Sequence, residues 1–167
     1  MRKTIGFGSM GLFLALGLFG SEALAVTTPV VVNPGFEADG TGVATPQGWT
    51  ESGSVNASFT EFGGHSGSFR LSNWSSDDYS VTTEQTVRGL RGDAFTMKAW
   101  VKRSPGQNNS YIELDCGAGA ERTYLPVAPA DEWLQIVVSA RKHRDACTLR
   151  LHTDATGGEW TNFDDIE

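Results

Sequence analysis

The sequence lacks the local signatures of several common enzyme classes. It has no His-Glu-x-x-His pair and no glycine-rich phosphate loop, and its two cysteines do not have metal-ligand spacing. Gly64-His65-Ser66-Gly67-Ser68 is not a nucleophile elbow, because Ser68 occupies the closing glycine position and no helical pattern follows. A pair of glycosidase carboxylates stays open, since such a pair has no local signature.

Basic residues are also scarce. The 167 residues include 13 Lys and Arg against 20 Asp and Glu, for a net charge of −7. Without a basic surface there is nothing to attract a phosphate backbone, so we expect no nucleic-acid partner. With 39% hydrophobic and 20% charged residues, the composition is that of one globular domain. An acidic surface repels anionic polymers, which favours a neutral polysaccharide as partner.

Long hydrophobic runs are absent except near the start. An apolar stretch over residues 5–20 follows two basic residues and precedes Ala23-Leu24-Ala25, a small-x-small cleavage pattern. The stretch is too short and too soon interrupted for a stable membrane span. We therefore predict a secretory signal peptide over 1–25, a mature domain over 26–167, an extracellular location and no membrane attachment after cleavage. An uncleaved membrane anchor is the alternative.

The two cysteines, Cys116 and Cys147, each share strand parity with apolar neighbours. Both side chains should therefore point inward. Because export favours pairing over free thiols, we predict a disulfide between them, with two buried free thiols as the alternative.

The hydrophobic pattern has period 2 and shows no run of ten or more residues with period 3.6 after the leader. In the clearest strand, over 95–102, Phe95 and Met97 alternate with Lys98 and Trp100. This predicts an all-β fold, a two-sheet antiparallel β-sandwich of jelly-roll type, with a lipocalin-like barrel as the alternative. The other expected strands lie over 54–61, 68–73, 81–87, 111–116, 122–126, 133–139, 147–152 and 162–167.

The two ends of the mature chain carry a specific pattern. Asn33-Pro34-Gly35-Phe36-Glu37, Gly48-Trp49, His65-Ser66-Gly67 and Phe163-Asp164-Asp165-Ile166 together resemble the jelly-roll carbohydrate-binding modules of the galactose-binding-like superfamily. The middle of the chain is most similar to family-61 modules, and the resemblance covers residues 30 to 167. The segments that carry it are Leu71-Ser72-Asn73-Trp74, Gln85-Thr86-Val87, residues 98–104, Gly106-Gln107, and Thr153-Asp154-Ala155 with Gly158 and Trp160.

The resemblance implies a function. Modules of family 61 bind β-1,4-linked galactan and often accompany family-53 endo-β-1,4-galactanases. We therefore expect a monomeric, non-catalytic module for β-1,4-galactan or a related arabinogalactan, with an attached or co-secreted glycoside hydrolase as partner. Two alternatives are the N-terminal part of a secreted arabinogalactan endo-β-1,4-galactanase, whose catalytic domain is not in this chain, and a calcium-stabilised adhesion or envelope domain without sugar specificity.

The sequence departs from the family pattern in three places. Asn73 stands where His is expected before Trp74, and Arg91-Gly92-Asp93 replaces a Pro-Asn-Gly turn. The sequence also stops at Glu167, before the last strand is complete.

The resemblance further implies a structural Ca²⁺ near the two chain ends. In the resembling jelly rolls, a Glu after Gly-Phe, an Asp of the terminal pair and carbonyls of the His-Ser-Gly turn come together. The matching residues here are Glu37, Ser66, Asp164 and Asp165. Ordinary solvated carboxylates are the alternative.

The five tryptophans divide by context. A sugar ring stacks its C–H groups on a flat indole, so an exposed Trp is a candidate contact. Trp100 should face outward by parity, and Trp74 and Trp160 lie in polar loop contexts. We predict that these three contact sugar, whereas Trp49 and Trp133 are packing residues.

Polar candidates follow from the same parity. Residues that oppose inward Ile112, Leu114, Leu149 and Leu151 should face outward. If their strands share a sheet with Trp100, one face combines aromatic rings with groups that pair sugar hydroxyls. A solvated polar face is the alternative. The candidates are Tyr111, Glu113, Arg150 and His152, together with Arg103 and Gln107 from the segments that carry the resemblance.

Overall fold

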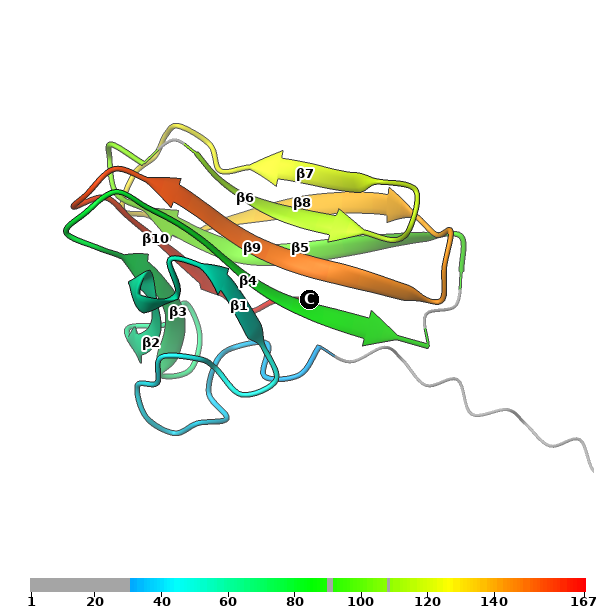
Figure 1. The fold of residues 1–167 in the computed structure, drawn as a ribbon, viewed down its shortest axis with the longest axis horizontal. Coiled ribbons are helices and arrows are strands. Elements are labelled where there is room, and N and C mark those ends of the chain that lie inside the picture. The colour runs from blue at the N-terminus through cyan, green and yellow to red at the C-terminus, as the bar shows by residue number, and fades with distance from the viewer. Residues whose placement is uncertain (1–30, 90–91, 108) are drawn as a thin grey trace, which may run out of the picture.

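The computed structural model describes residues 31–89, 92–107 and 109–167, in which two antiparallel five-stranded sheets pack face to face (Figure 1). The order is β1-β4-β9-β6-β7 in one sheet, here sheet A, and β2-β3-β10-β5-β8 in the other, sheet B. The predicted all-β sandwich is confirmed. The predicted signal peptide lies outside the described residues. Within the described part, no helix is long and apolar enough to cross a membrane.

Each sheet draws its strands from distant parts of the chain. The strands of sheet A are β1 (Thr50–Gly53), β4 (Tyr79–Arg88), β9 (Ala146–Ala155), β6 (Ser110–Asp115) and β7 (Ala120–Tyr124). The strands of sheet B are β2 (Ser58–Phe62), β3 (Phe69–Trp74), β10 (Trp160–Asp164), β5 (Ala94–Arg103) and β8 (Leu134–Arg141). A short 3-10 helix, η1 (Val55–Ala57), precedes β2.

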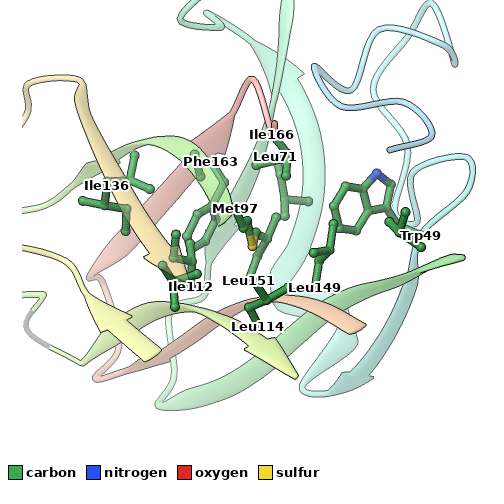
Figure 2. Close-up of a cluster of buried hydrophobic side chains, with 14 of the residues drawn as sticks. Trp49, Leu71, Met97, Ile112, Leu114, Ile136, Leu149, Leu151, Phe163 and Ile166 are labelled. Atoms are coloured by element: carbon green, nitrogen blue, oxygen red, sulfur yellow. The ribbon is translucent and has the colours of Figure 1, made fainter. Parts of the chain in front are cut away.

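The core lies between the sheets and is filled by alternate residues of both (Figure 2). In β4, buried and accessible positions alternate along the strand, as period-2 patterning requires. Trp49 is 4% exposed and tilts against Phe36, which confirms its predicted packing role. Burial of each large apolar side chain contributes about 1.5–3 kcal/mol. The most deeply buried include Phe36, Leu71, Met97, Ile112, Leu114, Leu151, Phe163 and Ile166.

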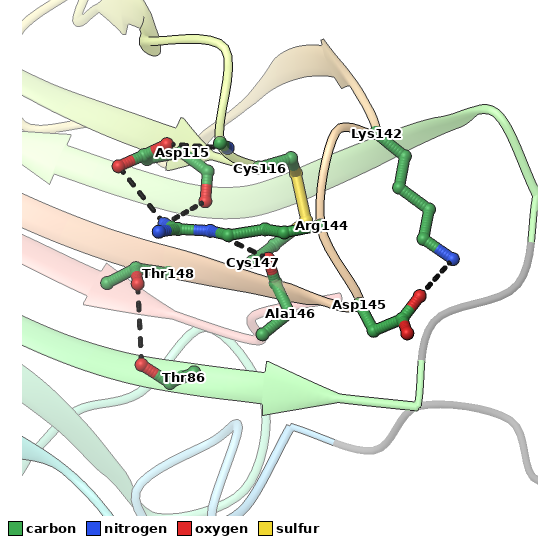
Figure 3. Close-up of a disulfide and its surroundings, with 10 residues drawn as sticks. Thr86, Asp115, Cys116, Lys142, Arg144, Asp145, Ala146, Cys147 and Thr148 are labelled. Carbon is green, nitrogen blue, oxygen red and sulfur yellow. Dashed lines mark hydrogen bonds and ion pairs between the residues drawn. A yellow bond between two sulfur atoms is a disulfide. The ribbon is translucent and has the colours of Figure 1, made fainter.

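The predicted disulfide is present (Figure 3). Cys116 follows β6 and Cys147 lies in β9, two strands that are neighbours in sheet A. Next to the bridge, Arg144 donates to the Asp115 carbonyl and pairs with its carboxylate, each at 3.2 Å. The bridge therefore joins strands that backbone hydrogen bonds already hold side by side.

Most strand ends lie within three residues of the expected ones, and three differences from the prediction have an identifiable cause. The strand expected over 54–61 starts at Ser58, because 55–57 form η1. The strand expected over 162–167 ends at Asp164, since Asp165 takes a positive φ of 46°. β1 was not predicted, because this edge strand of four residues is mostly exposed and lacks apolar alternation.

Candidate functional site

The outer face of sheet B carries a groove of about 350 Å³. Trp160 of β10 lies opposite Trp74 of β3, and Asn162 lies opposite Ser72 on one side and Lys102 on the other. These residues alternate with the core residues of their strands, so they share the outward face. We name this site the Trp74–Trp160 groove. Its lining residues are Phe59, Glu61, Arg70, Ser72, Trp74, Lys102, Asp131, Trp160 and Asn162.

The two tryptophans form the aromatic border of the groove. Trp74 is 46% exposed, and Trp160 is half-buried beside it. Directly opposed residues of antiparallel strands have Cβ atoms about 4.5–5.5 Å apart, so the two indoles start from adjacent positions. The Lys102 ammonium lies 5.8 Å from the Trp160 ring centroid. Large exposed indoles beside polar groups suit the apolar face of a hydroxylated ring.

The polar groups of the groove are balanced in charge. Arg70 Nη2 lies 3.0 Å from Glu61 Oε1, and Lys102 Nζ lies 2.8 Å from Asp131 Oδ1. Each cation thus has its own carboxylate. The described lining residues leave no excess charge, which suits a neutral ligand better than an ionic one.

Two polar atoms of the groove residues have no hydrogen-bond partner among the described residues. Asn162, 1% exposed, donates from Nδ2 to Ser72 Oγ at 2.8 Å. Among the described residues, its Oδ1 has no hydrogen-bond partner, and neither has Arg70 Nε. One acceptor and one donor therefore stay unpaired beside the tryptophans, an unusual state for buried polar atoms.

Trp100 faces outward, as predicted, but it lies outside the groove. It pairs with Asp164, four residues beyond Trp160 on β10, or roughly 13 Å away along the strand. Its indole stacks on His65 with centroids 3.8 Å apart, and Trp133 meets the same imidazole edge-on at 5.8 Å. One face of Trp100 is therefore already covered, and Trp133 packs on this cluster and not in the central core.

The condition that the polar candidates share a sheet with Trp100 is not met. Tyr111 and Glu113 lie in β6, and Arg150 and His152 lie in β9, both strands of sheet A, whereas Trp100 belongs to sheet B. Alternation within a strand predicts whether a side chain points inward or outward, but it does not predict which sheet the strand joins. The two sets of residues therefore occupy opposite outer faces of the sandwich.

On sheet A these four residues contact one another and their neighbours. Arg150 bonds both Glu113 and, at 2.7 Å, Glu84. The Tyr111 ring stacks on His152 with centroids 4.5 Å apart, and His152 Nδ1 lies 2.8 Å from Thr82 Oγ1. Burial lowers the pKa of His152. The face is an internally paired network, and sugar contact by its members stays a prediction.

Arg103 and Gln107 are buried, at 3% and 1% exposure. Arg103 donates to the carbonyls of Pro126 at 2.7 Å and Ser104 at 2.9 Å, and also to that of Gln107. This guanidinium therefore fixes the turn after β5. Gln107 lies at the end of the sandwich, away from the groove, and its Oε1 accepts from Asn109 N at 2.7 Å.

The structure brings the four predicted calcium residues together around Gly35 and the His65–Gly67 turn. A Cβ built on Gly35 would lie 3.6 Å from the Oδ1 atoms of both Asp164 and Asp165, and 3.9 Å from Glu37 Cγ. Ser66 Oγ donates to Asp165 Oδ1 at 2.6 Å. These donors are all oxygens, the chemistry that Ca²⁺ prefers.

In the described arrangement these carboxylates accept protein hydrogen bonds. Glu37 Oε1 accepts from two backbone N–H groups, and Asp164 Oδ2 accepts from His65 N at 2.6 Å. Burial, reinforced by the charge of Asp165, raises the pKa of Asp164 to about 6. Among described residues, no three His, Cys, Asp or Glu side chains converge as in a metal site. A calcium ion would thus need backbone carbonyls as well, and it stays a prediction.

Of the residues that line the groove, the sequence predicted only the two tryptophans. Ser72 and Asn162 alternate with the buried Leu71 and Phe163, which was the available signal for an outward position. Their proximity depends on β10 lying between β3 and β5, which no local pattern encodes. The missed residues are Phe59, Glu61, Arg70, Ser72, Lys102, Asp131 and Asn162.

No protein-family model matches the chain, and no curated protein sequence matches it. Among solved structures, it is similar to TmCBM61 in complex with β-1,4-galactotriose, with a TM-score of 0.71 and 18% identity over 84% of this chain and 97% of that one. The K3 cleaved adhesin domain of Lys-gingipain from Porphyromonas gingivalis W83 gives a TM-score of 0.58 and 19% identity, over 81% and 95% of the two chains. A CBM4 structure gives a TM-score of 0.55 and 10% identity, over 83% of this chain and 97% of that one. The jelly-roll fold implied by the sequence resemblance is therefore confirmed.

Proposed function

We propose that this chain is a non-catalytic carbohydrate-binding module that holds β-1,4-galactan, or a related arabinogalactan, in the Trp74–Trp160 groove. The observation that carries the proposal is the strand register, which sets two accessible indoles side by side over a charge-balanced polar floor. The fold shared with TmCBM61, whose complex contains β-1,4-galactotriose, supports the choice of galactan.

Binding requires stacking and hydrogen bonds only. The C–H face of a sugar ring lies on Trp74, and its hydroxyls are offered Asn162, Arg70 and the paired carboxylates at the groove edges. A volume of about 350 Å³ falls within the usual range of about 300–1,000 Å³ for ligand sites. No step of this account forms or breaks a covalent bond.

In this proposal the module acts after export, as a monomer, once residues 1–25 have been removed. It raises the local concentration of galactan for an attached or co-secreted glycoside hydrolase. In the alternative, the same module is the N-terminal part of a secreted galactanase, and the hydrolase is then covalently linked.

Affinity electrophoresis tests this function. We expect galactan or arabinogalactan in the gel to retard the purified chain, while xylan, mannan, β-glucan and polygalacturonate do not. Trp74→Ala should be retarded much less than the wild type, and the control Trp133→Ala, at a tryptophan outside the groove, should be retarded as strongly as the wild type. Equal migration in all gels, or release of galactose oligomers from galactan by the chain, would contradict the proposal.

We further propose that Ca²⁺ stabilises the chain ends, held by Glu37, Asp164, Asp165 and Ser66. The proximity of the Asp164 and Asp165 carboxylates at Gly35, with Ser66 Oγ bonded to Asp165 and the Glu37 carboxylate at the adjacent Gly67, supports it. Chelation of the metal-loaded protein should lower the melting temperature, and Glu37→Gln should remove this response whereas Glu61→Gln should keep it. An unchanged melting temperature in protein shown to contain calcium would rule the ion out as a stabiliser.

A further inference from the structure

A second cavity, of about 640 Å³, opens at one end of the sandwich. It lies where the β3–β4, β5–β6 and β9–β10 connections meet, and shares no lining residue with the Trp74–Trp160 groove. We name it the end cavity. Its described lining residues are Ser54, Asp78, Tyr79, Ser80, Gly106, Gln107, Asn109, Asp154, Ala155, Thr156 and Glu159.

The end cavity offers both hydrogen-bond acceptors and an unused donor. Asp78, Asp154 and Glu159 contribute carboxylates, which only accept hydrogen bonds. Gln107 is 1% exposed, and its Nε2 has no partner among the described residues. A buried amide without a partner is costly, so a ligand acceptor at this position would be favourable. A ligand that suits both must donate and accept, as hydroxyl groups do.

The charge of the cavity further restricts the class of ligand that it can bind. Among the described lining residues there are three carboxylates and no Lys, Arg or His. An anionic sugar would meet repulsion without a compensating cation. The cavity therefore suits sugar units without negative charge, whether neutral or amine-bearing.

The cavity wall is already fixed. Asp78 Oδ1 accepts from Gly157 N at 3.0 Å, and Asp154 Oδ2 accepts from Asn109 Nδ2 at 2.8 Å. A Cβ on Gly106 would lie 2.2 Å from Glu159 Oε1, so a side chain at this position would displace the Glu159 carboxylate. Side chains held before a ligand arrives lose little conformational entropy when it binds.

We infer that the end cavity is a second glycan-binding site, which takes a sugar unit without negative charge through the three carboxylates and the Gln107 amide. The end cavity is separate from the proposed groove, and the two sites share only the class of ligand. Two separate sites allow one module to hold two stretches of polysaccharide, which raises avidity without any new contact.

The test is a nuclear magnetic resonance titration of the whole protein with β-1,4-galactotriose. The Gln107 side-chain amide reports the end cavity, and the Trp74 and Trp160 indole N–H groups report the groove. We expect both sets of signals to shift, and the Gln107 response to persist in Trp74→Ala. A glucosamine trisaccharide should also shift the Gln107 signal, whereas a galacturonic acid trisaccharide should not.

A filling variant provides the second arm. Thr156 is exposed at the cavity and does not line the groove, so Thr156→Phe should weaken ligand binding at Gln107 about tenfold or more, a change of about 1.4 kcal/mol. The matched control Thr41→Phe, at an exposed turn elsewhere, should not.

The outcomes separate the two sites. Shifts of the indoles at saturation with no shift of Gln107 would overturn the second site and leave the groove standing. Shifts of Gln107 alone would support the end cavity and contradict the groove. Loss of every response in Trp74→Ala, or an equal response to galacturonic acid, would contradict a glycan-binding site in the end cavity.

Discussion

Removal of the Cys116–Cys147 disulfide should destabilise the domain without unfolding it. The change is the double substitution Cys116→Ala and Cys147→Ala. Both cysteines are buried, and the bridged strands stay paired through backbone hydrogen bonds, as in the Asp115 to Thr148 register. The native sandwich should therefore persist, while the unfolded chain gains conformational freedom.

The magnitude follows from the length of the loop that the disulfide closes. The cysteines are 31 positions apart in sequence. On the chain-entropy model, a loop of this length corresponds to about 3–4 kcal/mol of stabilisation. With a urea m-value of about 2 kcal/mol/M for a small domain, the unfolding midpoint should fall by about 2 M.

Urea unfolding followed by circular dichroism measures this change. The m-value should rise in the variant, because an unfolded chain without the cross-link exposes more surface. Asp145→Asn, which removes the exposed ion pair with Lys142 beside the bridge, is the control and should leave the midpoint unchanged. A loss below about 1 kcal/mol in the double variant would refute the reasoning, because the loop would then contribute little freedom to the unfolded state.

Two further predictions concern stability. Trp49→Ala should cost about 3–5 kcal/mol in urea unfolding, because the buried ring also donates from Nε1 to Asn33 O at 3.1 Å, whereas the accessible Trp74→Ala should leave the midpoint nearly unchanged. Burial lowers the pKa of His152 in the folded state below its ordinary 6.5, so the unfolded chain takes up the proton first as the pH falls. The free energy of unfolding should therefore decline as the pH drops from about 6.5 to the lowered pKa of folded His152, and it should level off below that pKa. In pH-dependent unfolding, His152→Gln should not show this decline, whereas His143→Gln should show it as the wild type does. A decline identical in wild type and His152→Gln would contradict the assignment.

The sequence predicted the strands and their inward faces well because both depend on local alternation. Met97 and Val101 are buried, and Trp100 between them faces outward, as period 2 requires. The disulfide followed from the same parity applied to Cys116 and Cys147.

Sheet membership could not be predicted in this way. The order β2-β3-β10-β5-β8 brings Trp74 beside Trp160 and leaves Trp100 at a different place on the same face. Likewise, β6 and β9 pair in the other sheet, so Tyr111 and His152 stack on each other far from Trp100. Such contacts depend on pairing between strands that are distant in sequence, and alternation within one strand does not predict this pairing.

Titration calorimetry of β-1,4-galactotriose into the wild type, Trp74→Ala and Trp160→Ala tests the central claim most directly. Loss of a stacking indole should weaken binding in the groove by about tenfold or more, while the melting temperature of Trp74→Ala stays within about 2 °C of the wild-type value. Wild-type affinity in both variants would contradict the assignment of the groove as the galactan site.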